Sequence, residues 1–168
     1  MLKPDQNCDN IATYMNEYME IAIIEAQKAA EADEVPVGAV IVKDGEIIGR
    51  GHNLTRSYRD PTAHAEMVAI RQAVEFSGSS RLTGCDMYVT MEPCAMCAGA
   101  MVLSRIRKLF IGTMDPKAGA CGSVLDVLGC SKLNHHVEVE SGMMEEECSR
   151  IVKDFFAELR KRNGGSNK

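Results

Sequence analysis

Apolar residues recur at helical spacing near the start of the chain. The recurring positions are Met15, Tyr18, Met19, Ala22, Ala26, Ala29 and Ala30. Steps of three and four residues bring these side chains onto one face of a helix, so the pattern predicts an amphipathic helix over roughly 13–33.

A β-hairpin is predicted directly after this helix. The segment from Val35 to Val42 is rich in β-branched residues, which favour strands. Asp44 and Gly45 then form a dipeptide typical of a two-residue hairpin turn, and Ile47 begins the return strand.

Two further helices have recognisable starting residues. Residues 53–62 predict a polar loop, and Thr62 is a suitable cap for a helix from Ala63 to about Phe76. Pro93 predicts the opening of a second helix that continues through Ser104, because proline is well tolerated in the first helical turn.

Short apolar runs and one long amphipathic segment complete the pattern. Strands are predicted at 87–90, 109–111 and 137–139, a glycine-containing loop at 112–123 and a last helix at 143–162. Because helices interleave with strands, the sequence predicts an α/β domain with a central mixed five-stranded sheet covered on both faces.

Composition agrees with one soluble domain. The chain has 168 residues, of which 45% are hydrophobic and 26% charged. It lacks an apolar run of about 18 residues and a basic-then-apolar start, so we expect a cytoplasmic protein. We expect a flexible N-terminal extension at 1–12, a single domain at 13–162 and a flexible tail at 163–168.

Charge is distributed unevenly along the chain. The net charge of -5 at first argues against a nucleic-acid partner. Residues 1–34, however, hold eight acidic and two basic side chains, whereas the remaining 134 residues hold 16 acidic and 17 basic ones. The body of the domain is therefore nearly neutral, which is compatible with a few local phosphate contacts.

Two short motifs at predicted helix starts carry metal-binding side chains. One contains His64 and Glu66, and the other contains Cys94 and Cys97. Residues three apart project from the same face of a helix, and a helix N-terminus favours the thiolate form of cysteine. One imidazole and two thiolates make a three-ligand zinc site, whose open fourth position is typical of catalytic zinc.

Glu66 then has a role other than metal binding. It follows His64 by two residues, which brings it close to a water molecule in the open position, and zinc lowers the pKa of such a water to near 7. A carboxylate there can act as a general acid/base. Taken singly, the cysteines could be redox-active or buried, the histidine a cap and the glutamate a helix-dipole partner. A matching ligand set at two helix starts favours the metal site.

The spacing of these motifs resembles that of a known family. His-x-Glu followed by Pro-Cys-x-x-Cys is the signature of the zinc nucleobase deaminases. Longer runs resemble the bacterial tRNA-specific adenosine deaminases of the cytidine/deoxycytidylate deaminase superfamily, and the resemblance covers about 13–160. These runs are Val35–Val40, Asp60–Glu66, Val89–Ala100, Asp115–Ser123 and Asn134-His135.

The resemblance implies a fold and a reaction. The fold would be the cytidine deaminase-like three-layer α/β/α sandwich, and the enzyme a homodimer with each active site near the partner subunit. The reaction would be hydrolytic deamination of adenosine to inosine at the wobble position of a tRNA anticodon. By this resemblance His64, Cys94 and Cys97 hold one Zn²⁺ per subunit and Glu66 transfers protons.

The resemblance also implies substrate contacts. Asn53 matches a position that hydrogen-bonds the flipped nucleoside, and Asp115, Lys117 and Asn134 match positions near the anticodon stem-loop. Further cations could contact phosphates. They are Arg56, Arg59 and the run Arg160-Lys161-Arg162, which could equally be a solvated helix end.

Two other functions fit the same motifs. The first is a deaminase of a free base or nucleoside, such as guanine or cytosine, within the same superfamily. The second is a structural zinc or redox CxxC module without hydrolytic activity. The other cysteines form no CxxC pair, so we interpret them as unreactive thiols; they are Cys8, Cys85, Cys121, Cys130 and Cys148.

Overall fold

A mixed five-stranded sheet lies at the centre of the computed structural model, which describes residues 6–164, with side chains from Met15 onward. The strands run in the spatial order β2-β1-β3-β4-β5. Their bounds are β1 Gly38–Lys43, β2 Glu46–His52, β3 Asp86–Met91, β4 Lys108–Thr113 and β5 Glu138–Ser141. Strand β1 pairs antiparallel with β2 and β3, whereas β3, β4 and β5 are parallel.

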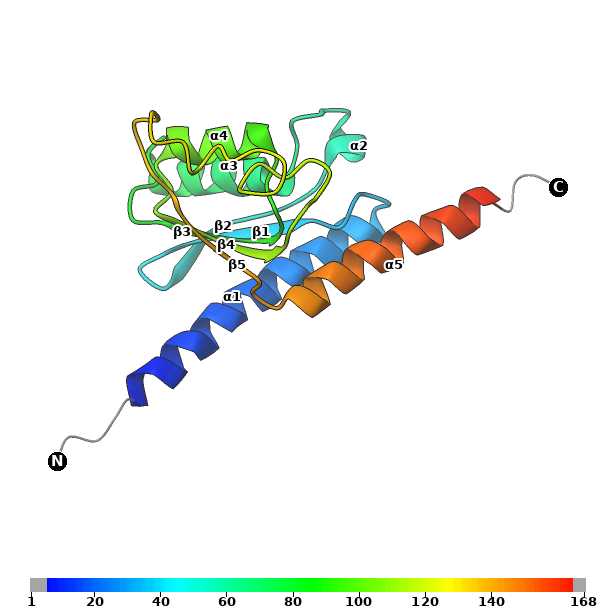
Figure 1. Cartoon of the computed structure of the whole chain (residues 1–168), viewed down its shortest axis with the longest axis horizontal. Coiled ribbons are helices and arrows are strands. Elements are labelled where there is room, and N and C mark those ends of the chain that lie inside the picture. Colours follow the sequence, from blue (N-terminus) through cyan, green and yellow to red (C-terminus); the bar gives the residue numbers. More distant parts are fainter. Residues whose placement is uncertain (1–5, 165–168) are drawn as a thin grey trace.

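Helices cover both faces of this sheet. Helices α1 (Gln6–Glu31) and α5 (Glu145–Gly164) lie side by side on one face, and α3 (Ala65–Ser77) and α4 (Ala95–Ser104) lie on the other (Figure 1). A four-residue helix, α2 (Thr55–Tyr58), precedes α3. The expected three-layer α/β/α architecture with a mixed five-stranded sheet is confirmed.

Side chains along the central strands point alternately to the two faces of the sheet and form two separate hydrophobic cores. Met87 and Val89 of β3 are fully buried in the core against α3 and α4. Tyr88, between them in sequence, faces α1 and stacks on Phe110 with ring centroids 4.5 Å apart. Successive side chains of a strand point to opposite faces, so one strand contributes to both cores.

Glycines in β2 allow α3 to approach the sheet closely. A Cβ atom at Gly51 would overlap the Ala65 carbonyl oxygen, and one at Gly49 would overlap that of Ala69. A larger residue would therefore push away the helix whose first turn carries Glu66. Gly49 and Gly51 therefore determine how closely the start of α3, which carries part of the candidate site, lies to the sheet.

Most predicted elements are present, and the hairpin has the predicted turn. Asp44 and Gly45 both have positive φ (51° and 84°), as a type I′ turn requires. The first helix begins at Gln6 and ends at Glu31, so its predicted range of 13–33 was wrong at both ends. The expected flexible segments 1–12 and 163–168 fall partly outside the described residues.

The region before the third helix differs from the prediction. The polar loop 53–62 contains α2, and α3 begins two residues later than predicted, with His64 at its N-cap. The Thr62 side chain does not cap this helix, because its hydroxyl and its backbone N–H both bond the Asp60 carboxylate. Sequence reasoning missed this local Asx turn, which competes with helix capping.

Candidate active site

The starts of α3 and α4 bring three metal-binding side chains together. His64 is the N-cap of α3, Cys94 is the N-cap of α4, and Cys97 lies in the first turn of α4. Both sulfur atoms lie 3.6 Å from His64 Nδ1. All three ligand atoms lie within 4.8 Å of one another, the only such group of three found among the described residues.

These separations fit a tetrahedral zinc ion. Zn–N bonds of about 2.0–2.1 Å and Zn–S bonds of about 2.3 Å, at a tetrahedral angle, place nitrogen and sulfur about 3.6 Å apart. The nitrogen–sulfur distances at this site have that value. The donor set of one imidazole and two thiols is also one that zinc prefers, so the residues fit the metal that the resemblance implies.

The two thiols differ in acidity. Hydrogen bonds from Cys97 and His64 lower the pKa of Cys94 to about 3. The hydrogen bond to Cys94, together with burial and nearby negative charge, raises the pKa of Cys97. A bound dication favours the thiolate form of both residues, because a coordinating thiol is deprotonated by its metal.

Glu66 lies in the first turn of α3, beside the donor set. Its residue surface is only 3% exposed, yet it lines the cavity described below. Burial raises the pKa of this carboxyl, since desolvation disfavours the charged form. A buried carboxyl next to a cavity is suited to accepting and returning a proton.

A cavity of about 380 Å³ opens onto these residues. Its size lies within the range of small-molecule sites. Segments distant in sequence form its walls: residues 35–37 and 53–55, the starts of α3 and α4, the loop after β4, and α5. The lining residues are Val35, Val37, Asn53, Thr55, His64, Ala65, Glu66, Met91, Glu92, Cys94, Asp115, Lys117, Ala118 and Phe156.

Asn53 lines this cavity, and its side-chain oxygen has no hydrogen-bond partner among the described residues. The residue is 7% exposed, and its Oδ1 atom is buried with no hydrogen-bond partner in the described part of the chain. A buried acceptor without a donor costs about 1–3 kcal/mol, so such atoms are rare in folded proteins. An incoming ligand that donates a hydrogen bond would satisfy it.

The structure brings together most, but not all, of the predicted substrate residues. Asn53, Asp115 and Lys117 line the same cavity. Asn134 is exposed and is not among the lining residues; its carbonyl oxygen accepts a hydrogen bond from Arg105 at 2.7 Å.

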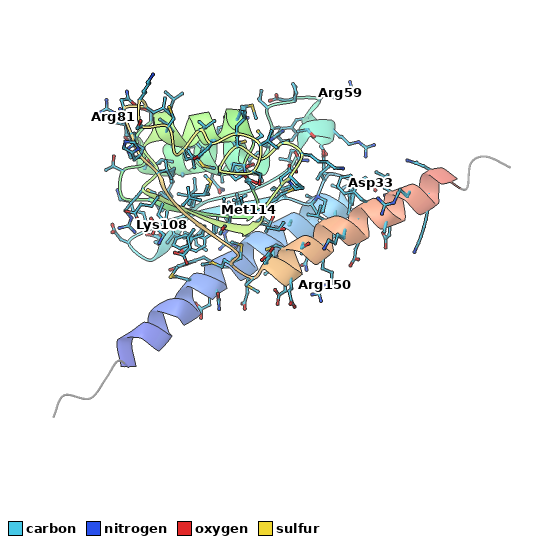
Figure 2. The ribbon with its side chains drawn as sticks, in the orientation of Figure 1. Asp33, Arg59, Arg81, Lys108, Met114 and Arg150 are labelled. Carbon is cyan, nitrogen blue, oxygen red and sulfur yellow. The ribbon has the colours of Figure 1, made fainter. Side chains whose placement is uncertain are left out.

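The candidate phosphate contacts differ in availability. The side chain of Arg56 donates to the Asp33 carbonyl oxygen, and Arg162 is paired with the Asp33 carboxylate. Arg59 and Lys117 are exposed, and Arg59 lies at the outer end of the α2 loop (Figure 2). Arg160 and Lys161 are exposed as well, and among the described residues neither these two nor Arg59 and Lys117 are held by Asp33.

Sequence reasoning missed Phe156 and Glu92. Phe155 is buried, and its neighbour Phe156 lies about 100° further round α5, where it lines the cavity. Two adjacent aromatic residues in a charged helix were the available signal. Glu92 lies between an apolar strand and Pro93, and such a buried carboxylate requires hydrogen-bond donors, which backbone N–H groups of Asp115, Cys121 and Ser123 provide.

The remaining described cysteines have no part in this cluster. Cys85, Cys121 and Cys148 are buried, and Cys130 is half-buried. Burial raises the pKa of Cys121 and Cys148 to about 12, which keeps both thiols protonated and unreactive. The side chain of Cys8 lies outside the described residues.

Family comparisons define first the class and then the particular family. The MafB19-like deaminase model matches residues 14–160, so the α/β sandwich and its site are those of a deaminase. The tRNA-specific adenosine deaminase of Bacillus subtilis is 50% identical over 151 residues, which cover 90% of this chain and 94% of the relative. That of Agrobacterium fabrum is 48% identical over 143 residues, which cover 85% and 94%. The chain therefore belongs to the tRNA-specific adenosine deaminases of the MafB19-like deaminase family.

Solved structures agree with this assignment. A structure from work on A-to-I editing by tRNA:A34 deaminases at the wobble position has a TM-score of 0.78 and 48% identity, over 80% of this chain and 98% of that chain. The guanine deaminase of Bacillus subtilis has a TM-score of 0.58 and 38% identity, over 64% of this chain and 69% of its own. No helix among residues 6–164 is long and apolar enough to cross a membrane.

Proposed function

We propose that this protein is a hydrolase that converts adenosine to inosine at the wobble position of a tRNA anticodon. The observation that carries the proposal is one cavity lined by the buried Glu66, by Asn53, and by His64 and Cys94, which form a metal-binding donor set with Cys97. Similarity to tRNA-specific adenosine deaminases over nine-tenths of the chain supports the choice of substrate.

The donor set would hold one Zn²⁺ per chain through His64 Nδ1 and the sulfur atoms of Cys94 and Cys97. When bound, zinc supplies Lewis acidity that makes water a nucleophile at neutral pH. Two helix starts hold the three ligand side chains at separations that fit the metal.

Glu66 would carry the protons of the reaction. Its carboxylate takes a proton from the water that attacks C6 of adenine and delivers it to N1 of the ring. The carboxylate then takes the proton of the new hydroxyl group on C6 and delivers it to the exocyclic nitrogen, and the C6–N bond breaks to release ammonia. The oxygen of the water remains on C6 as the carbonyl of inosine. Burial raises the pKa of Glu66, which suits the carboxyl to accepting and returning a proton.

The other lining residues would position the base. Asn53 Oδ1 accepts a hydrogen bond from the nucleoside, and Val35, Val37 and Met91 exclude water from its faces. A base must leave its stack to enter such a cavity, and the bases of an anticodon loop are already partly unstacked. Asp115, Lys117 and Asn134 would contact the flanking nucleotides.

The proposal includes a homodimer, a domain boundary and a location. Helix α4 presents an exposed face in which Leu103 is 80% exposed and Gly99 has open space around it. A second copy covering this face would bury it near the zinc ligands of the same helix.

Residues 13–162 form the single deaminase domain, in agreement with the family match over 14–160. A tRNA substrate places the activity in the cytoplasm.

A substrate comparison tests this function. Purified wild-type protein and a Glu66→Ala variant are incubated with an anticodon stem-loop that carries a wobble adenosine, and separately with adenosine, cytosine and guanine. We expect inosine in the stem-loop from the wild type alone. Turnover of guanine without the stem-loop would instead favour the free-base alternative, which the guanine deaminase neighbour motivates. Equal activity of Glu66→Ala would remove Glu66 from the mechanism.

A further inference from the structure

The chain makes a sharp turn between α1 and the cavity wall. Asp33 has a positive φ of 57°, which reverses the chain after the helix. The next residue, Glu34, is 0% exposed, although a carboxylate is costly to bury. The wall residues Val35 and Val37 follow directly. We refer to Asp33 and Glu34 as the elbow.

Glu34 is stabilised by neutral donors from α2. Ser57 donates its backbone N–H at 2.7 Å and its hydroxyl at 2.9 Å to Oε1. Arg56 N–H and the Thr55 hydroxyl donate to Oε2 at 3.2 and 3.3 Å. Burial alone would raise the pKa of Glu34, but these hydrogen bonds hold it below its ordinary value. The carboxylate therefore remains charged and fixes the turn at 55–57.

The elbow also contacts α5. Asp33 forms an ion pair with Arg162 at 2.7 Å, and its carbonyl oxygen accepts a hydrogen bond from Arg56 at 2.7 Å. Figure 2 shows Asp33 between the end of α1 and α5. The surface ion pair contributes little because it is exposed to solvent. The hydrogen bonds of the buried Glu34 to α2 therefore hold the elbow more strongly than the ion pair of Asp33 with α5.

The segment that Glu34 fixes includes substrate-facing residues. Asn53 and Thr55 both line the cavity, and Thr55 bonds Glu34 directly. The start of the segment is held by hydrogen bonds from Asn53 N–H to Val37 and from Leu54 N–H to Ala63. Its other end relies on Glu34. Replacing the carboxylate by an amide would remove the charge from these hydrogen bonds and leave one backbone N–H, that of Arg56 or Ser57, without its acceptor, so the segment would shift.

We propose that Glu34 is a positioning residue for the deamination: it holds segment 53–57 so that the Asn53 amide meets the nucleoside in a preformed geometry. This inference rests on the proposed function. A displacement of about 1 Å can cost on the order of 100-fold in rate, because catalysis depends on the orientation of the bound substrate. Glu34 touches neither substrate nor metal in this account and acts through Asn53.

The test compares Glu34→Gln with a control that removes the charge of a half-buried, ion-paired carboxylate. Asp86 is the first residue of β3, at the opposite end of the strand from Met91, which lines the cavity. Arg107 donates to the Asp86 carboxylate through two nitrogens, at 2.8 and 2.6 Å. Asp86→Asn therefore removes a charge far from the cavity. We expect Glu34→Gln to lower kcat/KM for the stem-loop by roughly 10- to 100-fold, with zinc content and circular dichroism unchanged. We expect Asp86→Asn to stay within about twofold of the wild type.

A double-mutant cycle separates positioning from stability. If Glu34 acts through Asn53, then Glu34→Gln should reduce kcat/KM by less than about threefold in an Asn53→Ala background. Additive falls would overturn the proposal. So would a Glu34→Gln variant that melts at a lower temperature but keeps the kcat and KM of the wild type. If Glu34→Gln fails to fold, Ser57→Ala removes one donor and should lower kcat/KM in the same direction by a few-fold.

Amide hydrogen exchange tests the proposal even if the protein does not form inosine. In the absence of substrate, residues 54–58 should exchange faster in Glu34→Gln than in the wild type, and at the wild-type rate in Asp86→Asn. Equal exchange in all three proteins would overturn the proposed anchoring. A wild type with protected residues 54–58 but no activity would instead refute the proposed function and leave the anchoring supported.

Discussion

Substitution of Glu92 by glutamine should destabilise the wall of the cavity opposite the elbow. Glu92 Oε1 accepts hydrogen bonds from the N–H groups of Cys121 and Ser123, at 2.9 and 3.1 Å. Oε2 accepts from the N–H of Asp115 at 2.9 Å and from the Ser123 hydroxyl. One carboxylate thus holds both ends of the segment 115–123, which contributes Asp115 and Lys117 to the cavity.

The cost of Glu92→Gln follows from this arrangement. The amide NH₂ fits better at the Oε2 position, because the Ser123 hydroxyl can rotate and accept from it, and only the Asp115 N–H loses its acceptor. One unsatisfied donor costs about 1–3 kcal/mol. The two bonds that remain at Oε1 change from charge-assisted to neutral, at about 1 kcal/mol each. Solvent access at Asp115 reduces the total, so we expect a loss of about 2–4 kcal/mol in unfolding free energy.

The assay is thermal unfolding of the zinc-loaded protein. A loss of 2–4 kcal/mol corresponds to roughly 4–16 °C in Tm for a domain of this size. Ser123→Ala serves as the comparison, since it removes only the hydroxyl bond and should cost about 1 kcal/mol. A Glu92→Gln protein with full zinc content and a Tm within about 1 °C of the wild type would refute this reasoning.

Further predictions concern packing, acidity, the metal and the dimer. Gly51→Ala places a methyl group against the Ala65 carbonyl oxygen. We expect the free energy of unfolding, measured by chemical denaturation, to fall by about 1–3 kcal/mol and the zinc content to decrease. Unchanged values would show that α3 can move away without cost. Because the folded-state pKa of Glu34 lies below its unfolded value, its contribution to stability is complete above pH 4.5 and is lost as the pH falls through the folded pKa. In Glu34→Gln the free energy of unfolding should depend less on pH in that acid range, and an unchanged pH dependence would contradict this role of Glu34. Cys94→Ala should reduce the metal content from about one zinc per chain to nearly none, measured by elemental analysis, and retained zinc would exclude the proposed ligand set. Leu103→Glu should convert the dimer to monomers in light scattering, and an intact dimer would exclude the α4 face as the interface.

The periodicity of apolar residues predicted the helices and strands, because each of these elements buries one face and so repeats apolar residues at its own period. The strands around Met87 and Leu109 and the hairpin at Asp44-Gly45 occur where the pattern indicated them. The two long outer helices are present as well, but the first begins earlier and ends earlier than predicted. The helix starts were less predictable. Thr62 has the composition of a cap, but the Asp60 carboxylate lies two residues away and captures its hydroxyl.

The cavity depends on contacts that a linear pattern does not contain. Asn53 and Asp115 are distant in sequence and share the cavity because of the strand order, and the resemblance to a family, not the spacing, selected them. The turn of α2 forms within a polar loop because Glu34, more than twenty residues earlier, accepts its donors. The metal cluster was predictable because its ligands lie in two short motifs with helical spacing.

The central claim is that Glu66 directs the addition of water to a wobble adenosine. The most direct measurement uses the zinc-loaded wild type and a Glu66→Gln variant, incubated in heavy-oxygen water with an anticodon stem-loop and followed by mass spectrometry of the digested nucleosides. We predict that the wild type forms inosine that carries the heavy oxygen at the wobble position only, and that Glu66→Gln forms none. Absence of inosine from a wild type containing one zinc per chain, or equal labelling by both proteins, would contradict the account.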